Sequence, residues 1–209
     1  MPSPLRRIRT KLEPAANRAK VLAGIGNYWT METGRPLDVR SLIFPLRFDV
    51  DVRRQFFALY RHLRGQSVDR ICAAASSHPY RMWVEHVLVP RNHPEAVGRP
   101  DDLDEIFRIR VRRSIAIHDS IEADGFDRSQ PIIPYTGDVI RPSPTGRIAP
   151  FAMVPGDGCH RLACLAAMGI DPIPAEYTSI RRFRRLTPLD NTAVLAKHLS
   201  IEAEWLEGL

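Results

Sequence analysis

The chain has 209 residues, a net charge of +6, and only three lysines among its 30 basic residues. This length suits one domain with an appendage or two small domains, and it can bury a real core. The composition is that of an ordinary globular protein without a bilayer-spanning apolar run, so we expect no membrane partner. Arginine enrichment fits an anionic ligand, because guanidinium groups bind phosphates in a bidentate manner, but a genomic base bias explains it equally well.

The three cysteines, Cys72, Cys159 and Cys164, make an odd count and have no metal-type spacing. The sequence begins without the apolar core of a signal peptide. We therefore expect a reducing, cytoplasmic location without structural disulfides.

Residues 1–79 are expected to form a mainly helical N-terminal extension. The sequence predicts a basic tail over 1–20, irregular chain over 21–45, and a helix over 49–63. Ser67 then caps a second short helix. Because two helices with a tight turn resemble a helix-turn-helix in outline, DNA is one candidate partner, although helix pairs are common in other proteins.

Residues 80–209 are expected to form the main α/β domain with a C-terminal helix. A strand is predicted over 80–90, followed by a helix from Asp101 and Asp102 that Gly125 ends as a C-cap. The remaining predicted elements are strands over 130–135, 150–154 and 173–177, a loop over 136–149, and helices over 159–168 and 188–206.

A glycine-rich turn precedes the helix predicted from Cys159. Gly156 and Gly158 permit backbone angles that other residues resist, so their N–H groups can point toward one ligand. The free N–H groups and positive dipole end of the helix add to this site, and Arg161 can donate a bidentate fork. These residues suit a phosphate, although any strand-to-helix connection can carry two such glycines.

Four segments in order carry a family resemblance: residues 120–126, the Gln-Pro-Ile at 130–132, the Asp-Gly-Cys-His-Arg-Leu-Ala at 157–163, and the Ile-Pro at 173–174. Together they resemble the ParB/sulfiredoxin superfamily, over roughly residues 82–177. The resemblance implies a compact nucleotide-binding α/β fold with a small mixed sheet. Residues 1–80 lie outside it.

The superfamily motif holds the phosphates of a nucleotide, here ATP or ADP (or CTP), with Mg²⁺. By resemblance, Gly158, His160 and Arg161 would contact the phosphates, and the glycine-rich turn adds Gly156 to the residues expected to hold them. Asp157 would serve the metal or the acceptor.

Functions diverge within this superfamily, and fold alone does not choose among them. The kinase-like members have the pattern Asp-Gly-His-His-Arg, which favours a phosphotransferase acting on a small hydroxyl-bearing acceptor, with Asp157, His160 and Arg161 as catalytic residues. Glu85 lies near the position of the kinase base without matching it cleanly. One alternative is a sulfiredoxin-like thiol enzyme that uses Cys159, and the other is a nucleotide-gated, ParB-like DNA-binding module.

Overall fold

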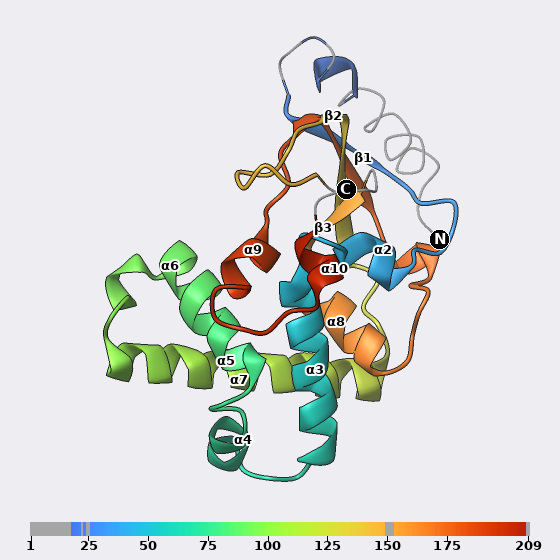
Figure 1. Ribbon diagram of the computed structural model, residues 1–209. Coiled ribbons are helices and arrows are strands. Elements are labelled where there is room, and N and C mark those ends of the chain that lie inside the picture. The colour runs from blue at the N-terminus through green and yellow to red at the C-terminus, as the bar shows by residue number, and fades with distance from the viewer. Residues whose placement is uncertain (1–17, 22, 24–25, 149–152, 208–209) are drawn as a thin grey trace.

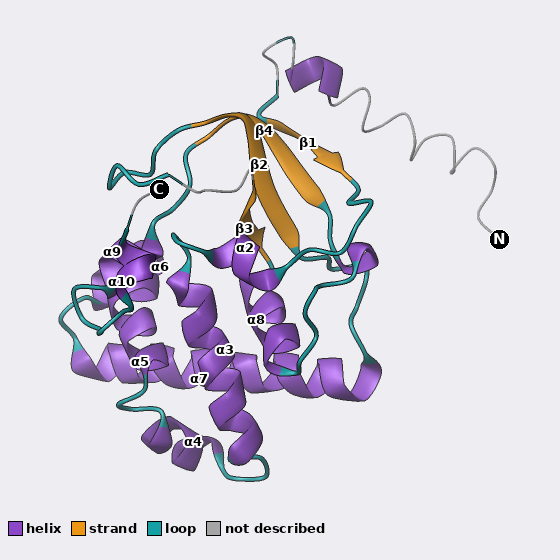
Figure 2. Cartoon of the chain, turned by 45° about the vertical axis from the view of Figure 1, so that its right-hand side comes forward, coloured by secondary structure: helices purple, strands orange, loops and turns teal. Residues whose placement is uncertain are grey.

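The structure is a computed structural model that describes residues 18–21, 23, 26–148 and 153–207. It is a mixed α/β fold in which one small sheet stands above a group of helices (Figures 1 and 2). Most of the expected basic tail, residues 1–17, lies outside the described residues.

The sheet has four strands in the order β1-β4-β2-β3. They are β1 (Tyr28–Met31), β2 (Ile133–Ile140), β3 (Met153–Asp157) and β4 (Ile180–Leu186). β2 and β4 are parallel, whereas the two outer pairs are antiparallel, so the sheet is mixed.

The helices differ widely in length. The longer ones are α3 (Phe48–His62), α4 (Val68–Ala74), α7 (Pro100–Asp124) and α8 (Cys159–Ala167). The short ones are α2 (Val39–Ile43), α5 (Pro79–Trp83), the π-helical turn η1 (Val84–Leu88), α6 (Val89–Asn92), the 3-10 turns η2 (Pro94–Ala96) and η3 (Ala175–Tyr177), α9 (Asn191–Leu195) and α10 (Ala203–Leu206). α3 and α8 lie side by side, and both contact α7 (Figure 1).

Several helix boundaries follow from local signals, as predicted. The Ser67 side chain accepts a hydrogen bond from the backbone N–H of Arg70 and so caps α4. Gly125, with φ of 78°, ends α7, because this left-handed region favours glycine. α8 begins at Cys159, where the sequence places it.

The strand predicted over residues 80–90 is wrong, because this segment is α5, η1 and the start of α6. Pro79 occupies the first turn of α5, and the His78 side chain accepts a hydrogen bond from the N–H of Tyr80. A short apolar run fits a buried helix as well as a strand, so the capping residues were the informative signal.

The C-terminal third also differs from the prediction. Residues 173–177 form a single bridge between Ile173 and Leu37 followed by η3, and the strand is instead the arginine-rich β4. The expected loop over 136–149 contributes its first five residues to β2. The expected strand over 150–154 overlaps β3 at residues 153–154, and its residues 150–152 lie outside the described residues. Two short helices replace the single helix predicted over 188–206.

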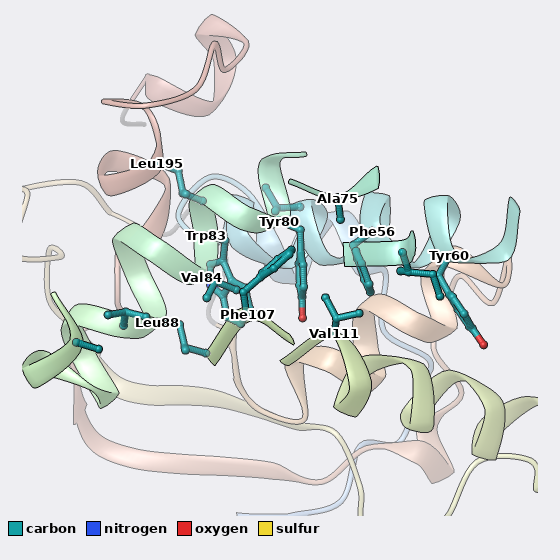
Figure 3. Packing of buried hydrophobic residues seen from close by; sticks show 14 residues of the cluster. Phe56, Tyr60, Ala75, Tyr80, Trp83, Val84, Leu88, Phe107, Val111 and Leu195 are labelled. Atoms are coloured by element: carbon teal, nitrogen blue, oxygen red, sulfur yellow. The ribbon is translucent and has the colours of Figure 1, made fainter. Parts of the chain in front are cut away.

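Two large hydrophobic clusters join the segments on both sides of residue 80. Phe56 of α3 lies in the cluster that contains Tyr80 and Trp83, and the neighbouring Phe57 lies in the cluster around α8. Figure 3 shows the Tyr80 ring between those of Phe56 and Trp83. Residues 26–79 therefore share their core with residues 80–207, and β1 completes the sheet beside β4.

Within the described residues, no helix has the length and apolar character needed to cross a membrane.

Candidate functional site: the start of helix α8

The turn between β3 and α8 leaves the first backbone N–H groups of the helix without a capping side chain. Gly158 has φ of 79°, and its carbonyl accepts the first helical hydrogen bond, from Leu162, at 2.9 Å. The N–H groups of residues 159–161 precede that bond and point out of the helix start. A Cβ at Gly158 would lie 3.1 Å from Cα of Ile132, so glycine is required here for space as well as for angle.

Gly156 has a different role from Gly158. It lies inside β3 against the ring of Tyr135, and a Cβ added to it would lie 2.1 Å from Cε1 of that ring. Gly156 therefore permits close packing of Tyr135 on β3.

Two charged residues of the motif have protein partners beside the turn. Arg161 donates to the side-chain oxygen of Gln130 at 2.9 Å and to the carbonyl of Pro131 at 3.2 Å. Asp157, half exposed at the end of β3, forms an ion pair with Arg181 of β4 at 2.6 Å. These contacts hold both side chains next to the uncapped helix start.

The Cys159 thiol lies on the other side of the turn, facing α3. It donates to the carbonyl of Gly156 at 3.1 Å and accepts from Nη2 of Arg47 at 3.4 Å. The same arginine donates to the carbonyl of Pro155. Arg47 thus binds both the thiol and the strand that leads to it.

A buried ion-pair network lies beneath the helix start. Asp49 is fully buried and forms ion pairs with Arg47 and with Arg53, each at 2.8 Å. Burial alone would raise the pKa of Asp49, but the two guanidinium groups reverse this effect and hold the pKa well below its usual value. Asp49 therefore remains charged and anchors both arginines.

His160 is half-buried and lies among cations and aromatic rings. Burial lowers its pKa well below the usual value, and the nearby charges of Arg53 and Arg110 lower it further. Its Nε2 lies 3.5 Å from the hydroxyl of Tyr80, which is hydrogen-bonded to Oγ of Ser114 at 2.8 Å. His160 is therefore neutral at pH 7.

Positive charge exceeds negative charge around this site. The guanidinium of Arg53 lies 4.1 Å from the centroid of the Trp83 ring, and its Nε and Nη1 have no hydrogen-bond partner among the described residues. Arg110, half-buried on α7, has no acidic partner in the described part of the chain. Asp49 and Asp157 are the carboxylates paired with the arginines at this helix start.

The network on α3 and the aromatic residues of α5 do not feature in the sequence predictions. Asp49 and Arg53 stand four residues apart on the helix face that also carries Val50 and Phe57, and charged residues on an apolar face were the available signal. Trp83 falls in the strand predicted over residues 80–90, and that prediction gives no indication of its contact with His160, at 5.4 Å between ring centroids.

Glu85, the weak candidate for a base, lies on a separate cleft of about 450 Å³. This cleft lies between η1 and the start of α7, and its lining includes Arg81, His86 and Pro100 but no residue of 156–161. The structure therefore does not bring Glu85 to the helix start.

A cluster elsewhere has donors that could hold a metal ion. Ligand atoms of His118, Asp119 and Glu122 lie within 4.8 Å of one another on α7. Asp119 already accepts from the hydroxyl of Tyr60, and Glu122 pairs with Arg64. Asp157, the residue expected to serve a nucleotide-bound metal, is not part of this cluster.

In comparisons with protein families, curated proteins and solved structures, the chain matches no family model, no curated protein and no solved structure.

Proposed function

We propose that the chain binds a nucleotide at the start of α8 and transfers a phosphoryl group from it to a small hydroxyl-bearing acceptor. The observation that carries this proposal is the start of α8. Gly158 has a left-handed backbone conformation, and the helix that follows has no capping side chain. The buried side chains beneath it include more arginines than carboxylates. Free N–H groups at a helix start together with cationic side chains favour phosphate. The resemblance of residues 157–163 to the superfamily motif is the reason for proposing that this phosphate belongs to a nucleotide.

In this proposal the backbone N–H groups of residues 159–161 and the guanidinium of Arg161 hold the phosphates. Asp157 offers a half-exposed carboxylate beside them, which suits Mg²⁺, because that ion takes one or two carboxylates together with phosphate oxygens. Mg²⁺ would supply charge neutralisation on the transferring group. On binding Mg²⁺, the carboxylate of Asp157 would either leave Arg181 or contact both the ion and Arg181.

His160 supplies the proton acceptor in this proposal. Its imidazole is neutral and can therefore accept a proton from the hydroxyl of the acceptor, although the lowered pKa makes it a weak base, and its Nε2 would have to exchange the Tyr80 hydroxyl for that of the acceptor. Arg53 and Arg110 disfavour a lasting imidazolium, so the proton would pass on to solvent or to the product phosphate.

A thermal-shift experiment with ATP, ADP and CTP, each with and without Mg²⁺, tests binding first. A ligand at about a hundredfold excess over its Kd should raise Tm by roughly 5–10 °C. Arg161→Ala should remove that rise, whereas Arg112→Ala, on the exposed face of α7, should keep it. Gln130→Ala is the sharper control, because it removes the side-chain acceptor of Arg161, leaves only the Pro131 carbonyl as a protein acceptor and so frees Nη1 for phosphate.

Phosphoryl transfer is then measured by ³¹P NMR against a panel of small hydroxyl compounds. Arg161→Ala should slow transfer roughly 10²-fold, as expected for the loss of a donor to the transferring group. No nucleotide-dependent rise in Tm, or the same rise in Arg161→Ala, would contradict the proposal.

Thiol chemistry at Cys159 is a second candidate, favoured by the contact between this thiol and Arg47. The half-buried thiol at the start of α8 lies next to a cationic group, which is a setting found for catalytic cysteines. Cys159→Ser should remove the alkylation that peptide mapping assigns to residue 159, apart from any labelling of the half-buried Cys72, and should abolish any dependent activity. Cys164→Ser should leave both unchanged, because Cys164 is fully buried and burial raises the pKa of its thiol to about 12.

A further inference from the structure

Strand β4 carries more positive charge than its neighbours neutralise. Four of its seven residues are arginines. Arg181 pairs with Asp157, and Arg182 pairs with Asp138. Arg184 and Arg185 are exposed and have no acidic partner among the described residues.

An aromatic row crosses the sheet on the face of β4 that carries Phe183 and Arg185, because alternate residues of a strand share a face, and Arg184 belongs to the opposite face. Phe183 lies between Tyr28 of β1, at 5.3 Å between ring centroids, and Tyr135 of β2, at 5.0 Å. Tyr28 is 41% exposed, so its ring is accessible to a ligand. Arg181 lies 5.0 Å above the Tyr28 ring and extends the row with a planar cation.

Arginines and an aromatic ring meet in one cleft. A cleft of about 470 Å³ lies where the chain enters β1, and it is lined by Gly26, Asn27, Phe183, Arg184 and Arg185. This volume is within the range of sites that hold small organic groups. Among the described residues, the lining has one aromatic residue, one asparagine and two arginines, and no acidic residue.

We propose that this cleft and the adjoining aromatic row bind single-stranded nucleic acid. Phe183 and Tyr28 offer ring faces on which unpaired bases stack, and Arg184 and Arg185 offer bidentate contacts to the backbone phosphates. The Asn27 amide can both donate and accept, as the edge of a base requires.

Chemistry favours this ligand over other polyanions. A duplex keeps its bases stacked inside and would meet only the arginines, so it leaves the aromatic row unused. The carboxylates of an acidic peptide could pair with the two guanidinium groups. Such a peptide would make no use of the exposed Tyr28 ring beside the half-buried Phe183. The cleft shares no lining residue with the turn at Gly158. The aromatic row does reach that turn, because Arg181 pairs with Asp157, but Phe183, Arg184 and Arg185 have no part in the proposed phosphotransferase.

Fluorescence anisotropy tests the proposal with the full chain and labelled oligonucleotides of about 12 nucleotides, a length that spans a typical single-strand site. Single-stranded DNA, single-stranded RNA and a duplex of the same sequence are compared over a series of salt concentrations. We expect at least one single strand to bind more tightly than the duplex. Its log Kd should rise with log salt, because each neutralised phosphate releases counterions.

Two variants separate charge from stacking. The double variant Arg184→Ala/Arg185→Ala should weaken single-strand binding roughly tenfold or more and reduce the salt slope by about 1.4, which is two phosphate contacts. Phe183→Leu keeps an apolar group against the sheet and should weaken binding roughly fivefold to a hundredfold with an unchanged salt slope. The matched control Arg112→Ala/Arg113→Ala removes the same charge from the exposed face of α7 and should bind as the parent does.

Three results would each overturn the proposal. The first is no single-strand binding at low salt by the folded chain. The second is a loss of single-strand affinity in the α7 control equal to that in Arg184→Ala/Arg185→Ala. Binding would then depend on total positive charge, as for any polyanion. The third is duplex binding as tight as single-strand binding together with no effect of Phe183→Leu, with circular dichroism used to verify that this variant is folded.

Discussion

Arg53 and Trp83 stack on each other, with the guanidinium carbon 4.1 Å from the centroid of the indole ring. This contact joins α3 to α5, two helices that lie on either side of the expected domain boundary. Both side chains are almost fully buried, and the arginine is also paired with Asp49. Several properties of the protein should depend on this buried charge.

Replacing Asp49 with alanine should destabilise the fold strongly. The change would leave Arg47 and Arg53 buried without their counterion, which typically costs about 3–5 kcal/mol of unfolding free energy. Urea denaturation followed by circular dichroism measures the loss. Asp69→Ala, which removes an exposed ion pair with Arg108, should cost at most about 1 kcal/mol. Similar losses in the two variants would mean that the buried network contributes no more than a surface pair.

The stability of the protein should fall as the pH decreases from 7 to 5. A histidine whose pKa is lowered in the folded state binds its proton first in the unfolded state, so stability is full above pH 6.5 and decreases below it. His160 has such a lowered pKa, and so do His78 and His86, chiefly because of burial in each case.

Thermal denaturation at pH 7 and pH 5 checks this dependence on His160. The variant His160→Asn should reduce the loss of stability between the two pH values by on the order of 1 kcal/mol. A larger loss of stability between pH 7 and pH 5 in His160→Asn than in the parent protein would contradict a lowered pKa of His160.

Gly156→Ala should disturb the packing of Tyr135. The added methyl group would lie 2.1 Å from the ring, which no real contact allows, so the ring or the strand must move. We expect a loss of about 1–3 kcal/mol, the usual cost of overpacking. Tyr135→Ala should make the same glycine substitution nearly neutral, and a double-mutant cycle measures that coupling.

The glycine control is Gly34→Ala, because no described residue other than its two chain neighbours places a heavy atom within 4 Å of a Cβ at that position. It should change stability by less than about 0.5 kcal/mol. If Gly156→Ala has no larger effect than Gly34→Ala, the close contact with Tyr135 is not maintained in solution.

Tyr80→Phe should lower stability although it removes a single oxygen. The hydroxyl of Tyr80 bonds to Oγ of Ser114, and both residues are fully buried. The variant leaves the Ser114 hydroxyl without that partner, at a cost of about 1–3 kcal/mol. Chemical denaturation measures the loss, and Ser114→Ala made in the Tyr80→Phe background should recover part of it.

The elements that could be predicted from the sequence are those with local signals. α4 begins at its serine cap, α7 ends at Gly125, and α8 follows the glycine at 158. These signals act through neighbouring residues alone, so no knowledge of the rest of the chain is needed.

The remaining elements depend on contacts between distant segments. β4 has little strand character in its Arg-rich sequence and owes its conformation to pairing with β1 and β2. The candidate site likewise has one part that local sequence predicts and one part that depends on contacts between distant segments. The turn at Gly158 was found from its sequence, whereas Arg47, Asp49 and Arg53 reach it only because α3 packs beside α8.

The outer position of β1 has a practical consequence for any attempt to study part of this protein. A fragment that starts at the apparent boundary near residue 80 would lack the four residues that cover the outer edge of β4, and would expose a row of unpaired N–H and C=O groups. It would also lack the phenylalanines of α3 against which α5 and α8 pack. Such a fragment should self-associate, so a shortened chain that retains the native sheet has to begin before Tyr28.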